Sequence, residues 1–276
     1  NISEHYDLSN EFFQLFLDSS MTYSSAFFET GNESLEKAQQ AKYELMCRSI
    51  NLKATDHVLE IGCGWGGFAL YAAKNFDCKV TGITISKRQF ELATERVRKA
   101  NLEKKIKIVF QDYRLMEGKF DKIVSIEMIE AVGHKYFNDY FKKIDALLAK
   151  NGIVGLQAII IPDKKYDEYR KSVDWIQKYI FPGGLLPSLE KINQSVNQTS
   201  ALNLYSLNEF GLSYTKTLSK WRENMFQNLS QIKDMGFDDK FTRKWEYYFS
   251  YCEAAFQQRN INLVQLVYSR PNNPEI

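Results

Sequence analysis

The sequence predicts an α/β fold in which helices cover both faces of a doubly wound sheet. Between residues 57 and 161, short apolar runs that suit strands alternate with longer amphipathic runs that suit helices. This alternation is typical of parallel strands joined by crossover helices. A glycine-rich turn directly follows the first apolar run. The carboxyl end of that strand is where sheets of this kind bind nucleotide-like ligands.

The individual elements follow from the same pattern. Strands are expected at residues 57–61, 79–85, 106–110, 122–128, 152–161 and 263–269, and helices at 65–75, 86–101, 134–149 and 214–258. After Pro162 the apolar pattern ends, and residues 163–200 are expected to form a lid over the carboxyl edge of the sheet. Gln157 interrupts the apolar run 155–161. Because a buried amide must form hydrogen bonds, we expect Gln157 to face a polar site.

Composition limits the possible functions. The 276 residues fit one α/β domain with insertions. Because 36 Lys and Arg balance 34 Asp and Glu, there is no general electrostatic case for nucleic acid as a partner. Cys47, Cys63, Cys78 and Cys252 have no CxxC spacing, which favours a reduced, cytoplasmic protein without a structural metal site. The chain lacks the run of about 18 apolar residues that a membrane-spanning helix needs.

The segment Val58–Gly67 is the most informative motif. Its glycines at positions 62, 64, 66 and 67 allow a tight turn and a close approach of a ligand to the backbone. Three of them also match the dinucleotide pattern G-x-G-x-x-G, but that pattern expects an acidic residue about 20 positions onward to bind the ribose. Ser86 follows the second strand instead, and the acidic residue, Glu60, precedes the glycines. E-x-G-x-G is typical of methyltransferases that use S-adenosylmethionine (SAM), so we predict SAM as the cofactor.

Further motifs are spread along the whole chain. They lie at His5–Asn10, Met21–Ser25, Gly82–Ser86, Gln111–Arg114, Glu127–Gly133, Tyr179–Gly184 and Tyr247–Phe256. Together with the glycine turn they resemble the cyclopropane fatty acid synthase family, which includes the mycolic acid cyclopropane synthases. The resemblance implies a seven-stranded, Rossmann-like SAM methyltransferase sheet with helical lid insertions.

The resemblance also implies an activity, the addition of a SAM-derived methylene group across a cis double bond of an unsaturated phospholipid acyl chain. Attack by the alkene leaves a carbocation that must be shielded from water, and a base must then remove a proton from the new methyl group. In the family this base is a bound bicarbonate ion, held by a glutamate, a tyrosine, a histidine and backbone amides. The matching catalytic positions here are Glu130, Tyr214, Gln157, Ser25, Ile159 and Cys252.

Three positions of this site depart from the family pattern. Ser25 stands where the family often has Cys, Gln157 where it has His, and Ala131 where it has a second His. Family contacts at the first position use mainly the backbone, so Ser should serve there. Gln157 can donate a hydrogen bond to bicarbonate but cannot carry a positive charge, so weaker bicarbonate binding is expected. Cys252 matches a family cysteine that we interpret as a buried structural thiol.

The resemblance assigns the cofactor contacts as well. The glycine turn is expected beside the methionine portion of SAM, with the acidic residue on the preceding strand. Ser86 is expected to be the N-cap of the helix that follows the second strand. The expected cofactor residues are Glu60, Gly62 and Gly64 at the turn, Tyr23 and Ser24 at the carboxylate end, Thr84 and Gln89 at the ribose, and Asp112, Tyr113 and Ile126 at the adenine.

The chain divides into four expected parts. Residues 1–50 would form an N-terminal helical segment covering the cofactor and acyl sites, and 51–162 would form the SAM-binding core. Residues 163–200 would form the lid insertion, and 201–276 would complete the sheet with a helical insertion. Because the first residue is not Met and no signal peptide follows it, we expect upstream sequence to have been removed.

A lipid substrate implies peripheral contact with the inner face of the cytoplasmic membrane. Residues Phe12, Phe13, Leu15, Phe16 and Leu17, or Leu185 and Leu186, would contact lipid or cover the acyl tunnel, although core burial is the more common role of such a helix face. A homodimer is a further expectation. Three alternatives stay open: a methyl- or methylene-branched product from the same cation, a small-molecule O- or N-methyltransferase, and a non-catalytic SAM- or lipid-binding protein.

Overall fold

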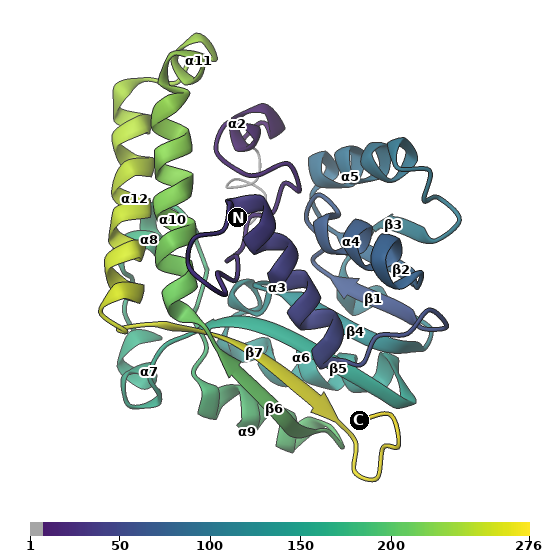
Figure 1. Ribbon diagram of the computed structural model, residues 1–276. Coiled ribbons are helices and arrows are strands. Elements are labelled where there is room, and N and C mark those ends of the chain that lie inside the picture. The colour runs from purple at the N-terminus through teal and green to yellow at the C-terminus, as the bar shows by residue number, and fades with distance from the viewer. Residues whose placement is uncertain (1–7) are drawn as a thin grey trace.

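The computed structural model describes residues 8–276, which form a seven-stranded sheet flanked by helices (Figure 1). The strands are β1 (His57–Ile61), β2 (Lys79–Thr84), β3 (Ile106–Phe110), β4 (Phe120–Ile126), β5 (Leu148–Ile160), β6 (Asn203–Glu209) and β7 (Asn262–Ser269). Their order across the sheet is β3-β2-β1-β4-β5-β7-β6. Neighbours among β1–β5 pair in parallel, whereas β7 is antiparallel to both β5 and β6. The predicted doubly wound α/β class is confirmed.

The predicted strands agree with the observed ones except at three places. The strand expected at 152–161 begins earlier, because β5 starts at Leu148, directly after α6 ends at Leu147. The sequence does not predict β6, an edge strand whose residues are nearly all exposed and which pairs only with β7. An exposed strand has no buried face to produce an alternating pattern. β4 ends at Ile126 rather than at residue 128, because Glu127 has a φ of +50°, which a continuing strand does not allow.

Helices cover both faces of the sheet, as predicted. α3 (Leu35–Ser49), α4 (Gly67–Phe76) and α5 (Lys87–Lys99) pack on one face, through a buried cluster that includes Met46, Phe68 and Val97. α6 (Phe137–Leu147) and α9 (Leu189–Thr199) pack on the other face (Figure 1). One expected helix, 134–149, begins with a short 3-10 turn, His134–Tyr136, before α6.

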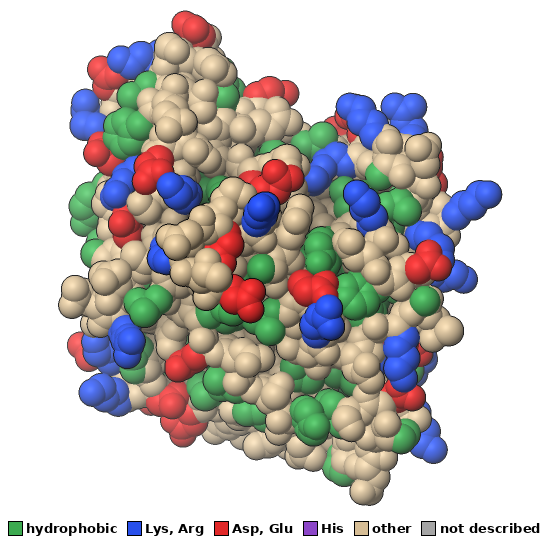
Figure 2. All heavy atoms as spheres, viewed as in Figure 1, with side chains coloured by type: hydrophobic (Ala, Val, Ile, Leu, Met, Phe, Trp, Pro, Cys, Tyr) green, Lys and Arg blue, Asp and Glu red, His purple; other side chains and the backbone are tan. Residues whose placement is uncertain are grey.

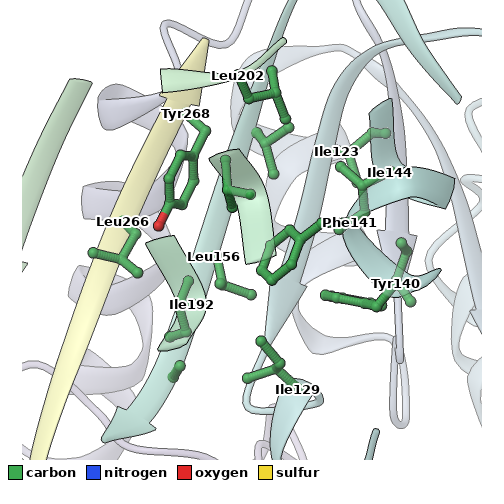
Figure 3. Packing of buried hydrophobic residues seen from close by; sticks show 14 of the residues in the cluster. Ile123, Ile129, Tyr140, Phe141, Ile144, Leu156, Ile192, Leu202, Leu266 and Tyr268 are labelled. Carbon is green, nitrogen blue, oxygen red and sulfur yellow. The ribbon is translucent and has the colours of Figure 1, made fainter. Parts of the chain in front are cut away.

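The core on the second face joins both halves of the chain. Figure 3 shows Phe141 of α6 and Ile192 of α9 beside Leu156 of β5 and Leu266 of β7. All four side chains are buried. α9 therefore belongs to the layer that covers the sheet and is not part of a lid.

The expected lid, residues 163–200, thus divides into two parts. Its first part contains α7 (Asp163–Tyr169) and α8 (Trp175–Tyr179). These helices and the loop after them contribute residues to the larger cavity described below. Within the expected lid, the residues that line that cavity fall between Lys165 and Leu186.

A helical cap is inserted between β6 and β7. It consists of α10 (Gly211–Gln227), α11 (Leu229–Asp234) and α12 (Asp239–Gln257), and α10 and α12 lie side by side (Figure 1). The short helix α2 (Asn10–Gln14) packs against this cap: the rings of Phe12 and Trp245 are 4.9 Å apart. Phe12, Phe13 and Phe16 are fully buried, so they do not face lipid, and core burial is the correct interpretation. Residues 1–7, including the start of the motif His5–Asn10, lie outside the described residues.

The surface in Figure 2 carries interspersed charges of both signs. The cap and α5 project at the upper edge of this view, and the outline is notched between them. This face has no large patch of a single sign such as nucleic acid requires. Within residues 8–276, no helix is long and apolar enough to cross a membrane.

Candidate active site

The glycine turn lies between β1 and α4 at the carboxyl edge of the sheet. Gly62, Gly64 and Gly66 have φ values of +81°, +52° and +81°, which residues with a Cβ rarely adopt. A Cβ on Gly62 would lie 2.7 Å from Met128 Cγ, whereas the space beside Gly64 is open. The turn therefore exposes its backbone on the Gly64 side, where a ligand can approach.

A cavity of about 340 Å³ opens on this turn. Glu60 is buried there, and its Oε2 atom has no hydrogen-bond partner among the described residues. Burial raises the pKa of Glu60 to about 8, although the charge of Lys42 lowers it. A buried carboxyl oxygen without a partner fits a ligand ammonium, which the methionine portion of SAM carries. The cavity is lined by all ten residues expected to bind the cofactor: Tyr23, Ser24, Glu60, Gly62, Gly64, Thr84, Gln89, Asp112, Tyr113 and Ile126.

Local hydrogen bonds hold the side chains at the ends of β2 and β3. Thr84 Oγ1 donates to Gln89 Oε1 at 2.8 Å, and Ser86 Oγ accepts the N–H of Gln89 as the N-cap of α5, as predicted. Asp112 accepts a hydrogen bond from Arg114 Nη2 at 2.6 Å, and this pairing lowers the pKa of Asp112. These contacts hold the rim of the cavity in place where the ribose and adenine are expected.

A second cavity, of about 610 Å³, adjoins the helical cap. Its lining is mostly apolar and aromatic. Tyr23, Glu127 and Ala131 line both cavities, so the two meet beside Glu127. Four of the expected catalytic residues also line the second cavity, namely Glu130, Ile159, Tyr214 and Cys252. So do Leu185 and Leu186, from the loop expected to contact lipid or to cover the acyl tunnel.

Three donors converge on the carboxylate of Glu127. Its Oε1 accepts the backbone N–H of Ser25 at 2.9 Å and the side-chain amide of Gln157 at 2.7 Å. Its Oε2 accepts the hydroxyl of Tyr214 at 2.7 Å. These are donors that the resemblance assigns to a bicarbonate ion. The resemblance has Tyr214 and Glu130 hold one bicarbonate ion, whereas the structure directs the Tyr214 hydroxyl to Glu127.

Neighbouring contacts orient two of these donors. The Ser25 hydroxyl donates a hydrogen bond to the carbonyl of Ala26 at 2.9 Å. Ser25 therefore binds Glu127 through its backbone N–H and not through its side chain. Gln157 accepts a hydrogen bond from Gln265 at 2.9 Å through its Oε1 atom. This contact directs the NH₂ group of Gln157 to Glu127, and Gln157 does face a polar site as its place in an apolar strand predicts.

Glu130 has a different environment. Its Oε1 accepts the N–H of Ile159 at 2.6 Å, and its Oε2 has no partner among the described residues. Burial and the neighbouring charge of Glu127 raise the pKa of Glu130 to about 8, so this carboxyl is protonated at neutral pH. Burial also leaves the pKa of Glu127 above its usual value, but the three donors and Lys42 each counteract this rise. Glu127 is therefore the better candidate for an ionised carboxylate, and Glu130 for a neutral one.

Tyr214 and Cys252 come from the helical cap. The ring of Tyr214 stacks on Phe256 with centroids 4.5 Å apart, and burial raises the pKa of its hydroxyl, which stays protonated. Burial raises the pKa of the Cys252 thiol to about 12. A protonated thiol is a poor nucleophile, which supports a packing role for Cys252.

Sequence reasoning missed Glu127 as a site residue. The sequence marks Glu127 only as a carboxylate directly after β4, at the carboxyl edge of the sheet. Glu130 stands three residues later and fits the same description. The positive φ of Glu127, a strained conformation that is frequent at active sites, is not visible in the sequence. Over residues 8–276, no group of three or more His, Cys, Asp and Glu side chains is arranged to hold a metal ion.

Comparison with known proteins shows relatives along the whole chain. Residues 1–266 match the mycolic acid cyclopropane synthetase family. The chain is 41% identical to cyclopropane-fatty-acyl-phospholipid synthase of Escherichia coli (strain K12) over 268 residues, which are 97% of this chain and 67% of that protein. It is 37% identical to tuberculostearic acid methyltransferase of Mycobacterium tuberculosis over 281 residues, which cover 99% of this chain and 66% of that protein. The chain thus spans about two thirds of the length of these relatives.

A solved structure shares the fold over nearly its whole length. Mycolic acid cyclopropane synthase CmaA1, complexed with SAH and CTAB, matches with a TM-score of 0.91 at 27% identity, over 98% of this chain and 97% of that one. SAH, S-adenosylhomocysteine, is what SAM becomes when it loses its methyl group. The glycine turn, the sheet order and these relatives agree. The chain belongs to the mycolic acid cyclopropane synthetase family of SAM-dependent methyltransferases.

Proposed function

We propose that the protein transfers a one-carbon unit from SAM to a cis double bond of an unsaturated phospholipid acyl chain, with a cyclopropane as the product. The observation that carries this proposal is the meeting of two cavities at one hydrogen-bonded carboxylate, Glu127. The first cavity contains the residues expected to bind SAM. The second is mostly apolar, and its volume of about 610 Å³ lies within the usual range of small-molecule pockets, which leaves room for part of an acyl chain.

The residues at the meeting point suit a carbocation mechanism. When bound, SAM supplies a methyl group on a sulfonium centre, and attack on it by the alkene leaves SAH and a carbocation on the acyl chain. Glu127 stabilises this cation by its charge and accepts the proton that leaves the new methyl group as the ring closes. Aromatic side chains that line the second cavity, among them Tyr23, Phe181 and Tyr248, exclude water and provide π electrons near the cation.

In this proposal Glu127 replaces the bicarbonate expected from the resemblance. Bicarbonate would need the donors Ser25, Gln157 and Tyr214, and all three are directed at Glu127. A carboxylate carries the same negative charge as bicarbonate. A second anion beside it in a buried site would be repelled, because like charges at short range destabilise each other.

A methylene-branched acyl chain is the second candidate product, and the bonding of Glu127 favours it. Both products lose a proton from the same added methyl group. The branched product arises when a hydride shifts to the cation before that proton leaves. Hydrogen bonds from three donors lower the basicity of Glu127, which lengthens the time available for the shift. A relative of similar identity is named a tuberculostearic acid methyltransferase.

Incubation of the protein with SAM and vesicles of a dioleoyl phospholipid tests the proposal. We expect release of SAH with this lipid and none with its saturated counterpart. Proton NMR of the recovered fatty acids distinguishes a cyclopropane from a methylene branch, which have the same mass. Tight SAM binding without SAH release would instead favour a binding protein and contradict catalysis.

We further propose that the acyl chain enters past an aromatic rim formed by Trp175, Tyr179, Tyr247 and Tyr251. The ring centroids of Trp175 and Tyr247 are 4.4 Å apart, and Tyr251 stacks on Tyr247 at 5.9 Å. The three tyrosines are exposed, and Tyr251 also lines the second cavity. Tyr and Trp favour membrane interfaces because their rings are apolar and their polar atoms can reach water. This rim, rather than α2, is the proposed site of peripheral membrane contact.

A further inference from the structure

A buried cation lies behind the proposed base. Lys42 of α3 is fully buried, and its Nζ donates a hydrogen bond to Ser24 Oγ at 2.8 Å. The same ammonium lies 4.1 Å from the centroid of the Tyr43 ring. Ser24 lines the first cavity and precedes Ser25, whose N–H binds Glu127. Burial of an ammonium is unfavourable because it loses its hydration, so its presence here requires compensation by nearby charge.

That compensation comes mainly from Glu127 just after β4 and Asp18 in the segment after α2, and Glu60 on β1 adds to it when it is ionised. Burial lowers the pKa of Lys42 to about 8, and the charges of Glu127, Asp18 and Glu60 raise it. Lys42 in turn lowers the pKa of both Glu127 and Glu60. It is therefore mostly protonated at neutral pH, and its charge acts on the proposed base and on the carboxylate of the cofactor cavity together.

We propose that Lys42 is a positioning residue that keeps Glu127 ionised at neutral pH and couples it to Glu60. This inference rests on the function proposed above, because it takes Glu127 as the base. The backbone of Lys42 supports the same site. Its carbonyl accepts the side-chain amide of Gln265 at 3.4 Å, and Gln265 orients Gln157 toward Glu127.

The remaining groups that face Glu127 do not supply this charge. They are Ser25 from the N-terminal segment, Gln157 from β5, Tyr214 from α10 and Glu130 from the turn after β4. Only Glu130 and Tyr214 among these four titrate, and burial raises the pKa of each above neutrality. Both are therefore neutral where Glu127 must be ionised, which leaves Lys42 as the cation that acts on it.

The pH at which Glu127 titrates tests this role. Lys42→Met removes the charge and nearly preserves the volume. Lys122→Met is the matched control, because Lys122 is also buried but lies near the start of β4, at the edge of the sheet opposite to Glu127. Its Nζ lies 3.8 Å from Asp56 Oδ2. With dioleoyl phospholipid vesicles, we expect the acid limb of the kcat profile to move up by about one pH unit in Lys42→Met. It should stay in place in Lys122→Met.

A ¹³C NMR titration of the Glu127 carboxyl, assigned with Glu127→Gln, measures the same shift without turnover. If no lipid is converted but the titration midpoint rises in Lys42→Met, the proposed function fails and the role of Lys42 stands. An unchanged midpoint in a folded variant overturns that role, as does an equal fall of kcat at every pH. If Lys42→Met does not fold, the same measurements are made on Lys42→Gln, which keeps a hydrogen-bond donor for Ser24 and removes the charge.

Discussion

At the residue scale, the proposed chemistry depends on which of two neighbouring carboxyl groups is ionised. Glu127 accepts three hydrogen bonds and feels the charge of Lys42. Glu130, three positions later, accepts one hydrogen bond, from the N–H of Ile159. Its Oε2 atom has no hydrogen-bond partner among residues 8–276. Hydrogen bonds to the charged form favour ionisation, and burial without them opposes it. Two adjacent carboxyls can therefore hold different charges at the same pH.

Glu127→Gln should remove the base while leaving the shape of the site intact. We expect kcat for lipid methylation to fall by about 10² to 10⁴-fold, the usual contribution of a general base. SAM binding, measured by calorimetry, should persist. Glu253→Gln is the matched control, because this α12 carboxylate pairs with Arg222 at 2.8 Å and lines neither cavity. Full activity in Glu127→Gln would exclude it as the base.

The raised pKa of Glu60 predicts that SAM binding is linked to proton release. In the free protein burial raises the pKa of Glu60 to about 8, so the carboxyl is protonated at neutral pH. A ligand ammonium would lower this pKa. Binding should then release a proton, and affinity should rise by up to about tenfold per pH unit between roughly pH 6 and 7.5. Calorimetry in buffers of different ionisation enthalpy measures the release. The same proton count in Glu60→Gln would refute the assignment.

Single residues were predictable from the sequence where strand ends position them. The ten expected cofactor residues line one cavity because most of them lie at or just after the carboxyl ends of β1, β2, β3 or β4, and these ends meet at one edge of the sheet. The partner of Tyr214 was not predictable. It depends on how α10 meets the turn after β4, which is 87 positions away in the chain, and on the backbone torsion of Glu127.

At the scale of elements, burial pattern decided what could be predicted. β1, β2, β5 and β7 are nearly continuous buried runs, and all four were expected. β6 is exposed along its length and forms only by pairing with β7, so no local pattern marks it. α9 has an ordinary amphipathic sequence, and only its contact with α6 shows that it belongs to the sheet layer.

The aromatic rim on α8 and α12 should govern binding to vesicles. Replacing Tyr179 and Tyr247 by Ser together removes two exposed rings from the proposed membrane contact. We expect vesicle affinity in a sedimentation assay to fall about tenfold, equivalent to about 1.4 kcal/mol, with kcat at saturating lipid unchanged. Tyr205→Ser is the control, because Tyr205 is exposed but belongs to the edge strand β6 and not to the rim. Equal losses in both variants would argue against the rim.

At the scale of the whole molecule, the site exists only where distant segments meet. The donors to Glu127 come from the N-terminal segment, from β5 and from the helical cap. The cap is inserted between β6 and β7 and closes the apolar cavity against the sheet edge. The family resemblance predicted which residues would gather there. It could not predict that the donors expected for bicarbonate would bind a carboxylate of this chain.

The dependence of turnover on bicarbonate tests this central claim most directly. Lipid methylation is measured in buffer freed of carbon dioxide and again with added bicarbonate at the same pH. Because Glu127 already accepts hydrogen bonds from Ser25, Gln157 and Tyr214, we predict the same kcat in both conditions. A kcat that falls without carbon dioxide and recovers when bicarbonate is restored would contradict the account.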